Sequence, residues 1–143
     1  FAFLMIVTTK GEEETIRLGE KIAKGLKPGD LVALSGDLGA GKTTLVKGIA
    51  KGLGVKDYRH VNSPSFVLVK EYKGKTPLYH FDIYRLNNLK DIEDIGYEDY
   101  LGRRGVVVIE WAKKMGRILP KKYLGISLKI KNHNQRIINI KKP

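Results

Sequence analysis

The chain has 143 residues, enough for one domain, and a formal net charge of +12 at pH 7. It contains no cysteine, which excludes disulfides, thiolate metal sites and a cysteine nucleophile. No apolar run reaches membrane-spanning length and no signal-peptide pattern opens the chain, so we expect a cytoplasmic protein without a membrane partner.

The N-terminal part is predicted to hold a strand at residues 3–7 and an amphipathic helix at residues 12–26. Glutamates in the first turn of this helix suit its positive dipole end. One stripe of the helix carries small and apolar residues: Ile16, Gly19, Ile22, Ala23 and Leu26. Residue 1 is phenylalanine, and residues 1–4 are an added extension if Met5 is the natural start, which the sequence leaves open.

A glycine-rich loop at residues 36–43 carries the strongest functional signal. It reads Gly36-Asp37-Leu38-Gly39-Ala40-Gly41-Lys42-Thr43 and fits G-x-x-x-x-G-K-[ST], the phosphate-binding loop. An apolar strand is predicted before it at residues 31–34 and a helix after it at residues 43–53, which is the setting that the motif requires.

The chemistry of this loop follows from its residue types. Glycines let successive backbone N–H groups point at a phosphate, and the helix start adds its positive dipole end. Lys42 is expected to reach the β- and γ-phosphates of a nucleotide, and the Thr43 hydroxyl to bind Mg²⁺. A nucleotide site is therefore predicted rather than a glycine-rich turn that binds nothing.

Residues 56–101 are predicted to hold a loop, a hairpin and a short helix. The loop covers residues 56–64, and the hairpin joins residues 66–72 to residues 78–82. Residues 87–101 are rich in acids and space Leu89, Ile92 and Ile95 for a short helix.

The C-terminal part is predicted to be mainly β-structure. Residues 106–109 are all valine or isoleucine and are expected to form a buried central strand. Residues 124–131 and 136–141 alternate apolar and polar side chains, which predicts a second hairpin with one basic, solvated face. The predicted fold class is α/β: one three-layer phosphate-loop NTPase-like domain over residues 1–143, with a mixed sheet and added antiparallel hairpins.

The positive charge is concentrated in the last part of the chain. Residues 101–143 contain one acid, Glu110, and twelve basic residues: Arg103, Arg104, Lys113, Lys114, Arg117, Lys121, Lys122, Lys129, Lys131, Arg136, Lys141 and Lys142. This asymmetry favours a nucleic-acid partner. The alternative is a lysine-rich solvated surface of the kind found in heat-stable proteins.

Two acids are candidates for the chemistry of a nucleotide site. A phosphate-loop enzyme needs an acid for its metal at the end of an apolar strand, and Glu110 meets that description. We expect it to serve Mg²⁺ directly or through water, rather than to pair with a surface lysine. Asp82 can orient the attacking water or the metal's water shell, but an exposed turn aspartate fits its position equally well.

Other polar residues give weaker signals. Residues 62–66 form a hydroxyl-rich turn that can sense a γ-phosphate, although Ser-Pro is also ordinary turn chemistry. Trp111 is expected to pack near the site, and Arg85 fits a structural ion pair better than a role in catalysis. The three histidines, at positions 60, 80 and 133, are scattered and indicate no metal cluster.

Four segments, in order, match motifs of one known family. They are residues 34–44, similar to G-D-L-G-A-G-K-T-T; residues 61–66, similar to V-x-S-P-T-F; residues 80–86, similar to H-x-D-x-Y-R-L; and residues 109–111, similar to I-E-W. On these motifs the chain resembles the TsaE (YjeE) family, the small ATPase of bacterial tRNA threonylcarbamoyladenosine modification, over nearly its whole length.

The resemblance implies ATP and Mg²⁺ as cofactors, with Lys42 and Asp82 serving hydrolysis and Thr43 and Glu110 serving the metal. It implies these nucleotide-binding residues: Thr15, Gly36, Asp37, Leu38, Gly39, Ala40, Gly41, Lys42, Thr43, Thr44 and Trp111. It also implies action with two partner proteins, one of which performs the threonylcarbamoyl transfer. Two positions depart from the family: Ser65 replaces a threonine and keeps the hydroxyl, and Lys113 stands where an acid is frequent, so the role of that acid is in doubt here.

Three other functions compete with this interpretation. A small-molecule kinase needs an acceptor site and a mobile lid, for which the chain has little sequence left. A GTPase is disfavoured because no N-K-x-D segment is present to read guanine. A nucleotide-regulated RNA-binding module fits the basic C-terminal region, which we expect to contact tRNA, but without catalysis it leaves the phosphate loop unexplained.

Overall fold

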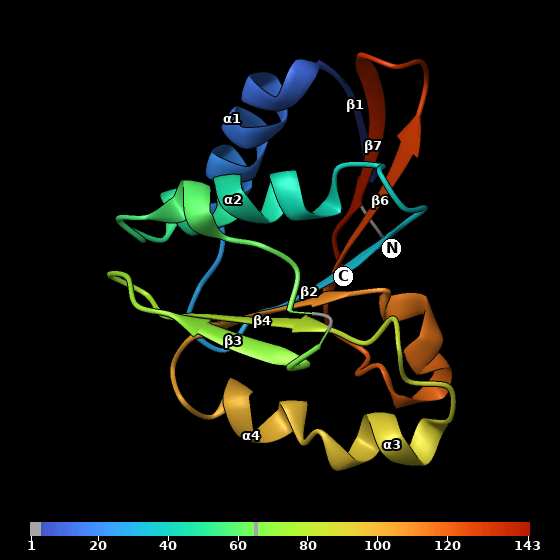
Figure 1. Ribbon diagram of the computed structural model, residues 1–143. Coiled ribbons are helices and arrows are strands. Elements are labelled where there is room, and N and C mark those ends of the chain that lie inside the picture. Colours follow the sequence, from blue (N-terminus) through green and yellow to red (C-terminus); the bar gives the residue numbers. More distant parts are fainter. Residues whose placement is uncertain (1–3, 65) are drawn as a thin grey trace.

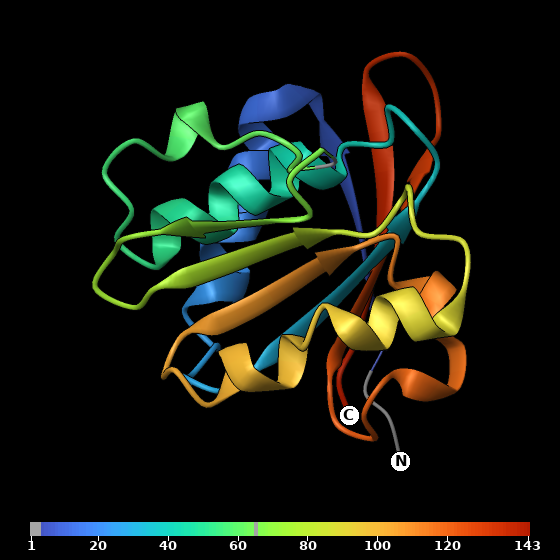
Figure 2. The same cartoon turned by 60° about the horizontal axis from the view of Figure 1, so that its bottom comes forward.

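The computed structural model describes residues 4–64 and 66–143 and shows a mixed β-sheet with helices on both faces (Figures 1 and 2). Within these residues the sheet has seven strands in the order β1-β7-β6-β2-β5-β4-β3. They are β1 (Leu4–Lys10), β2 (Leu31–Gly36), β3 (Val69–Tyr72), β4 (Leu78–Asp82), β5 (Val106–Glu110), β6 (Leu124–Ile130) and β7 (Gln135–Lys141). The four neighbours β6, β2, β5 and β4 are parallel, and antiparallel pairs extend the sheet at both sides. The predicted α/β class with a mixed sheet is confirmed.

One face of the sheet is covered by α1 (Gly11–Ala23) and α2 (Lys42–Gly52), as Figure 1 shows. The two helices touch through their backbones, since a Cβ added at Gly48 would lie 2.1 Å from the Ile16 carbonyl oxygen. The predicted stripe is confirmed: Ile16, Gly19 and Ala23 are buried, and Ile22 and Leu26 pack against the same core. This core fixes α1 and α2 above the parallel strands and so places the start of α2 at one end of the sheet.

The opposite face is covered by α3 (Leu89–Asp94), α4 (Tyr97–Leu101) and the 3₁₀ segment η2 (Ala112–Ile118), which lie in front of the sheet in Figure 2. A second core forms there, built on strand residues such as Phe81, Val107 and Ile109. The short helix predicted within residues 87–101 is confirmed as α3, and Gly96, with φ 70°, separates it from α4, which was not predicted. None of the described helices is long and apolar enough to cross a membrane.

The hairpin before the middle of the chain is shorter than predicted. β3 begins at Val69 rather than at Phe66, and Leu68 ahead of it has φ 68°, which is outside the range of a strand. Phe66 is therefore not in the sheet and is 82% exposed. The predicted loop at residues 56–64 contains one 3₁₀ turn, η1 (Tyr58–His60). Ser65 and residue 3, included in predicted elements, lie outside the described residues.

The C-terminal hairpin is confirmed, but its predicted basic face is wrong in part. In the register of β6 and β7, Lys129 faces Ile137 and Lys141 faces Gly125, so these two lysines share one side of the sheet. Arg136 pairs with Ile130 and lies on the other side, toward the glycine-rich loop, where it is half-buried. Side chains of a strand alternate between faces, so one residue of register decides which basic groups are solvated together.

Candidate functional site

The phosphate loop lies between the end of β2 and the start of α2, as predicted. Gly41 precedes the helix with φ 99° and ψ 17°, a left-handed conformation that residues with a Cβ rarely adopt. Gly36 also has a positive φ, and a Cβ there would lie 2.7 Å from the carbonyl oxygen of Leu128 on β6. The first backbone N–H groups of α2, those of Lys42, Thr43 and Thr44, have no partner within the helix and are available to an anion.

Lys42 is held inside the loop, with 5% of the residue exposed. Its Nζ donates hydrogen bonds to the carbonyl oxygens of Gly36 at 2.5 Å and Asp37 at 2.9 Å. The same atom lies 4.2 Å from the ring centroid of Trp111, a cation–π contact. Burial lowers the pKa of Lys42, and the Glu110 and Asp82 carboxylates oppose that effect. A charged lysine with two neutral carbonyls as its hydrogen-bond acceptors is well suited to exchange them for a phosphate.

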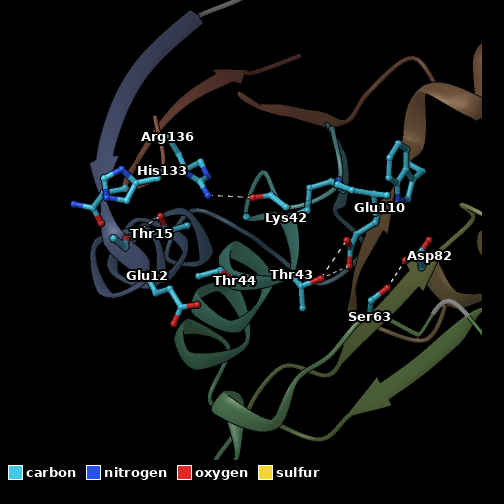
Figure 3. Close-up of a pocket in the computed structure, with 16 residues that line it drawn as sticks. Glu12, Thr15, Lys42, Thr43, Thr44, Ser63, Asp82, Glu110, His133 and Arg136 are labelled. Atoms are coloured by element: carbon cyan, nitrogen blue, oxygen red, sulfur yellow. Dashed lines mark hydrogen bonds between the residues drawn. The ribbon is translucent and has the colours of Figure 1, made fainter. Parts of the chain in front are cut away.

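The two acids predicted for the site lie side by side. β4 and β5 are parallel neighbours, and their register pairs Asp82 directly with Glu110 at the ends of the strands. Both residues are buried, at 3% and 2% exposure. Thr43 Oγ1 donates to Glu110 at 3.3 Å to Oε1 and 3.2 Å to Oε2, so the first turn of α2 and the end of β5 meet here (Figure 3). Asp82 is therefore not the exposed turn aspartate that the sequence also allowed.

Asp82 links the strand end to the hydroxyl-rich turn. Its Oδ2 accepts a hydrogen bond from Ser63 Oγ (Figure 3). Its Oδ1 accepts one from the backbone N–H of Tyr84 at 2.9 Å. The turn predicted as a γ-phosphate sensor thus contacts the acid predicted to handle water.

Trp111 packs against Tyr84, whose loop is held in turn by Lys114. Its backbone adopts φ 65°, and its ring lies 4.8 Å from the Tyr84 ring, centroid to centroid. Lys114 Nζ donates to the carbonyl oxygens of Tyr84 and, at 3.2 Å, of Leu86. Lys113, the position that departs from the family pattern, is exposed. The contact between Trp111 and Tyr84 could not be predicted from the alternation of residues in a strand, because both residues lie outside the strands.

The phosphate loop, the two acids, Ser63 and Trp111 contribute to the lining of one cavity of about 520 Å³, a volume within the usual range for a small-molecule site. Figure 3 shows that the labelled side chains come from distant parts of the chain, from Glu12 near the N-terminus to Arg136 near the C-terminus. Among the predicted site residues, the cavity is lined by Thr15, Leu38, Gly39, Gly41, Lys42, Thr43, Thr44, Asp82, Glu110 and Trp111. Gly36, Asp37 and Ala40 do not line it: the first two present carbonyls to Lys42, and Ala40 is buried in the core.

The tip of the β6–β7 hairpin forms a wall of the cavity that sequence reasoning missed. His133, Asn134 and Arg136 line it, together with Gly11 and Glu12 at the start of α1. Arg136 Nη2 donates to the Gly39 carbonyl oxygen at 3.2 Å, and the Gly11 N–H donates to the Asn134 carbonyl at 2.8 Å. The sequence showed that Arg136 is a cation, but its position at the cavity depends on the pairing of β6 with β7.

One weaker prediction, a structural ion pair of Arg85, was wrong. No ion pair between Arg85 and an acid is found in the described part of the chain; its guanidinium lies 4.0 Å from the Phe66 ring centroid instead. Among the described residues, no three histidine, cysteine or acidic side chains gather around one point.

The donor set suits Mg²⁺ bound together with a phosphate. Mg²⁺ usually takes one or two protein oxygens, several waters and phosphate oxygens, whereas a cage built from protein alone would need more ligands. The Thr43 hydroxyl and the Glu110 carboxylate supply such oxygens beside the N-terminus of α2, and Lys42 adds a cation. A polyphosphate with its metal therefore matches the chemistry of this cavity.

The chain is similar to proteins described as TsaE. The family model for "Threonylcarbamoyl adenosine biosynthesis protein TsaE" matches residues 9–138. A tRNA threonylcarbamoyladenosine biosynthesis protein TsaE from Bacillus subtilis is 44% identical over 131 residues, covering 91% of this chain and 80% of that protein. The one from Treponema pallidum is 38% identical over 136 residues, covering 95% and 99%. A crystal structure of Bacillus subtilis YdiB superposes with a TM-score of 0.78 at 35% identity, covering 99% of this chain and 87% of that one.

Proposed function

Because the chain belongs to the TsaE family of tRNA threonylcarbamoyladenosine biosynthesis proteins, we propose that it binds and hydrolyses Mg²⁺-ATP in support of the complex that makes this modification. The observation that carries the proposal is the convergence of Lys42, Thr43, Glu110 and Asp82 on one cavity at the ends of parallel strands. Phosphoryl transfer to water needs a cation, a metal-binding hydroxyl and carboxylates beside a phosphate loop.

The nucleotide is held by the loop and the start of α2. Backbone N–H groups there face the phosphates, and Lys42 exchanges its two carbonyl partners for phosphate oxygens. Thr43 and Glu110 hold Mg²⁺, which when bound neutralises charge on the phosphates. Arg136 lines the same cavity and adds a second cation on the side of the β6–β7 hairpin.

Asp82 handles the water that attacks the terminal phosphate. Its carboxylate is buried next to Glu110 and is held by the Ser63 hydroxyl and the Tyr84 N–H, which limits its rotation. An oriented carboxylate can accept a hydrogen bond from water and align it for in-line attack. Because Ser63 belongs to the hydroxyl-rich turn, a change in that turn would change the position of Asp82.

Two partner proteins complete the cycle in this proposal. Apolar side chains are exposed on loops that border the cavity: Leu38 at 68%, Phe66 at 82% and Val67 at 59%. Large apolar side chains exposed beside a cavity favour contact with another protein. Isolated protein should hydrolyse ATP slowly, since nothing yet orders these loops around the water.

The test is a set of single substitutions at the four converging side chains. Lys42→Ala should abolish ATP turnover, because loss of a buried charge-assisted contact costs about 2–5 kcal/mol. Glu110→Ala should weaken the Mg²⁺ dependence of ATP binding. Asp82→Ala should lower the rate of hydrolysis more than the affinity, as expected for a group that acts in the transition state. Binding is measured by calorimetry and turnover by phosphate release.

Lys113→Ala is the matched control, since Lys113 is exposed and does not line the cavity. Its ATP affinity and turnover should equal those of the unaltered protein. Turnover that survives Lys42→Ala, or a fall of equal size in Lys113→Ala, would contradict the proposed site.

A further inference from the structure

A buried histidine lies behind the acid that we assign to Mg²⁺. His80 is on β4, two residues before Asp82, and the register of β4 with β5 pairs it with Val108, two residues before Glu110. Residues two apart on a strand share a face, so His80, Asp82 and Glu110 all project to the α2 side of the sheet. His80 is fully buried, at 0% exposure, and is not among the residues that line the cavity.

Within the described part of the chain, the imidazole makes one polar contact, and that contact is with Glu110. His80 Nε2 lies 2.5 Å from Glu110 Oε2, the oxygen that also accepts from Thr43 Oγ1 at 3.2 Å. His80 Nδ1 has no hydrogen-bond partner among the described residues. A ring with its single hydrogen on Nε2 satisfies this pattern, because it donates to the carboxylate and leaves only an acceptor unpaired.

An apolar side chain would fill this place at lower cost if packing were the whole role. The position lies between the sheet and α2, where the neighbouring core is made of valine, leucine and isoleucine. Burying an imidazole there costs free energy unless its polar atoms gain something in return. Among residues 4–64 and 66–143, the compensating interaction is the hydrogen bond with the Glu110 carboxylate.

We propose that His80 is a positioning residue for the metal site: it holds the Glu110 carboxylate in the rotamer that faces Thr43 and so prepares it for Mg²⁺. The inference rests on the proposed function, since it assigns His80 a part in the same Mg²⁺-nucleotide site. Groups behind a metal ligand commonly change metal affinity by about 10–100-fold when they are removed. Because His80 does not line the cavity, it would act through Glu110.

The experiment compares His80→Gln with His80→Asn. A glutamine amide nitrogen reaches about as far as Nε2 and can donate to Glu110, whereas the asparagine amide reaches about as far as Nδ1 and cannot. Calorimetry measures ATP affinity over a range of Mg²⁺ concentrations and in EDTA. We expect His80→Asn to need at least about 10-fold more Mg²⁺ for half its maximal gain in affinity, and His80→Gln to stay within about threefold. Affinity in EDTA should be the same in both variants.

A purely structural role predicts another pattern. The free energy of unfolding is measured for both variants in urea, and a core histidine would lose stability in each without a change in Mg²⁺ dependence. Equal Mg²⁺ dependence of His80→Asn, His80→Gln and the unaltered protein would overturn the inference while leaving the proposed function standing. The unaltered protein gaining no ATP affinity from Mg²⁺ would instead overturn the proposed function, and this inference with it.

Discussion

Lys42 is a buried cation, and its burial determines how ATP binding should depend on pH. Burial is the main reason why its pKa lies below the ordinary lysine value, and the nearby carboxylates only partly restore it. A bound polyphosphate would favour the ammonium form and raise the pKa again. As the pH rises, the free protein therefore loses this proton before the complex does, and nucleotide affinity falls.

We accordingly predict weaker ATP binding on the alkaline side, beginning at a pH below about 10.4, the usual lysine pKa. The matched variant is Lys42→Arg, whose guanidinium stays charged throughout this range. The ATP affinity of this variant should not change with pH. It should be lower throughout if the guanidinium fits the phosphate loop poorly. The measurement is the ATP dissociation constant from calorimetry at steps of pH. A parallel decline in both proteins would assign the effect to another group.

At the scale of elements, the crossing of α1 and α2 decides how the cavity is built. The two helices approach so closely that a Cβ at Gly19 would lie 2.4 Å from the Leu45 carbonyl oxygen, and one at Gly48 would be as crowded against α1. The same packing sets where the start of α1 lies, and that start carries Thr15 to the cavity wall. Thr15 is also tied to β1 by a hydrogen bond of 2.8 Å between its hydroxyl and that of Thr9.

Gly48→Ala should therefore destabilise the protein. The added methyl group meets backbone rather than a flexible side chain, so the helices must separate, and overpacking of this kind costs about 1–3 kcal/mol. Gly25→Ala is the matched control, because a Cβ at Gly25 would have its nearest neighbour at 3.6 Å, an ordinary contact. Urea unfolding of both variants gives the two free energies. Equal stability of Gly48→Ala and Gly25→Ala would contradict the close crossing.

At the scale of the whole molecule, the basic C-terminal region offers a surface for a binding partner. The basic residues of the β6–β7 hairpin lie in two places: Lys129, Lys131 and Lys141 are exposed, whereas Arg136 lines the cavity of the candidate site. Solvated lysines of this kind suit contact with the phosphates of tRNA, which gives affinity without reading sequence. Arg136 belongs to a different function and must be tested apart from them.

We predict weak, salt-sensitive tRNA binding that is lost when Lys129, Lys131 and Lys141 are all changed to glutamate. The logarithm of the affinity should fall with the logarithm of salt with a slope of about −0.7 to −0.9 for each phosphate neutralised. ATP affinity should survive in this variant. Arg136→Ala should do the reverse, weakening ATP binding with little effect on tRNA, because its guanidinium faces the phosphate loop.

A titration of tRNA at several salt concentrations, with calorimetry for ATP, separates these outcomes. Absence of tRNA affinity at low salt, combined with loss of binding to the two partner proteins in the triple variant, would assign the exposed lysines to protein contact. Loss of ATP binding in the triple variant would contradict the division of the hairpin.

Much of the architecture could be predicted from local sequence. The glycine loop with its flanking strand and helix, the buried run at residues 106–109 and the C-terminal hairpin all have short-range signals, because backbone conformation and periodicity depend on near neighbours. The strand predicted to begin at residue 66 was wrong at its start, because Leu68 adopts φ 68° and β3 begins only at Val69. The second short helix, α4, was not predicted.

The sequence by itself determined which groups the protein has for its chemistry: Lys42 and Thr43 in the loop, and Glu110 and Asp82 each at the end of a strand. Only the tertiary structure decided how they meet. The parallel register of β4 with β5 pairs Asp82 with Glu110 and brings His80 behind them, and the hairpin register turns Arg136 toward the loop. Such pairings join residues far apart in the chain and depend on how whole strands align, so no short segment encodes them.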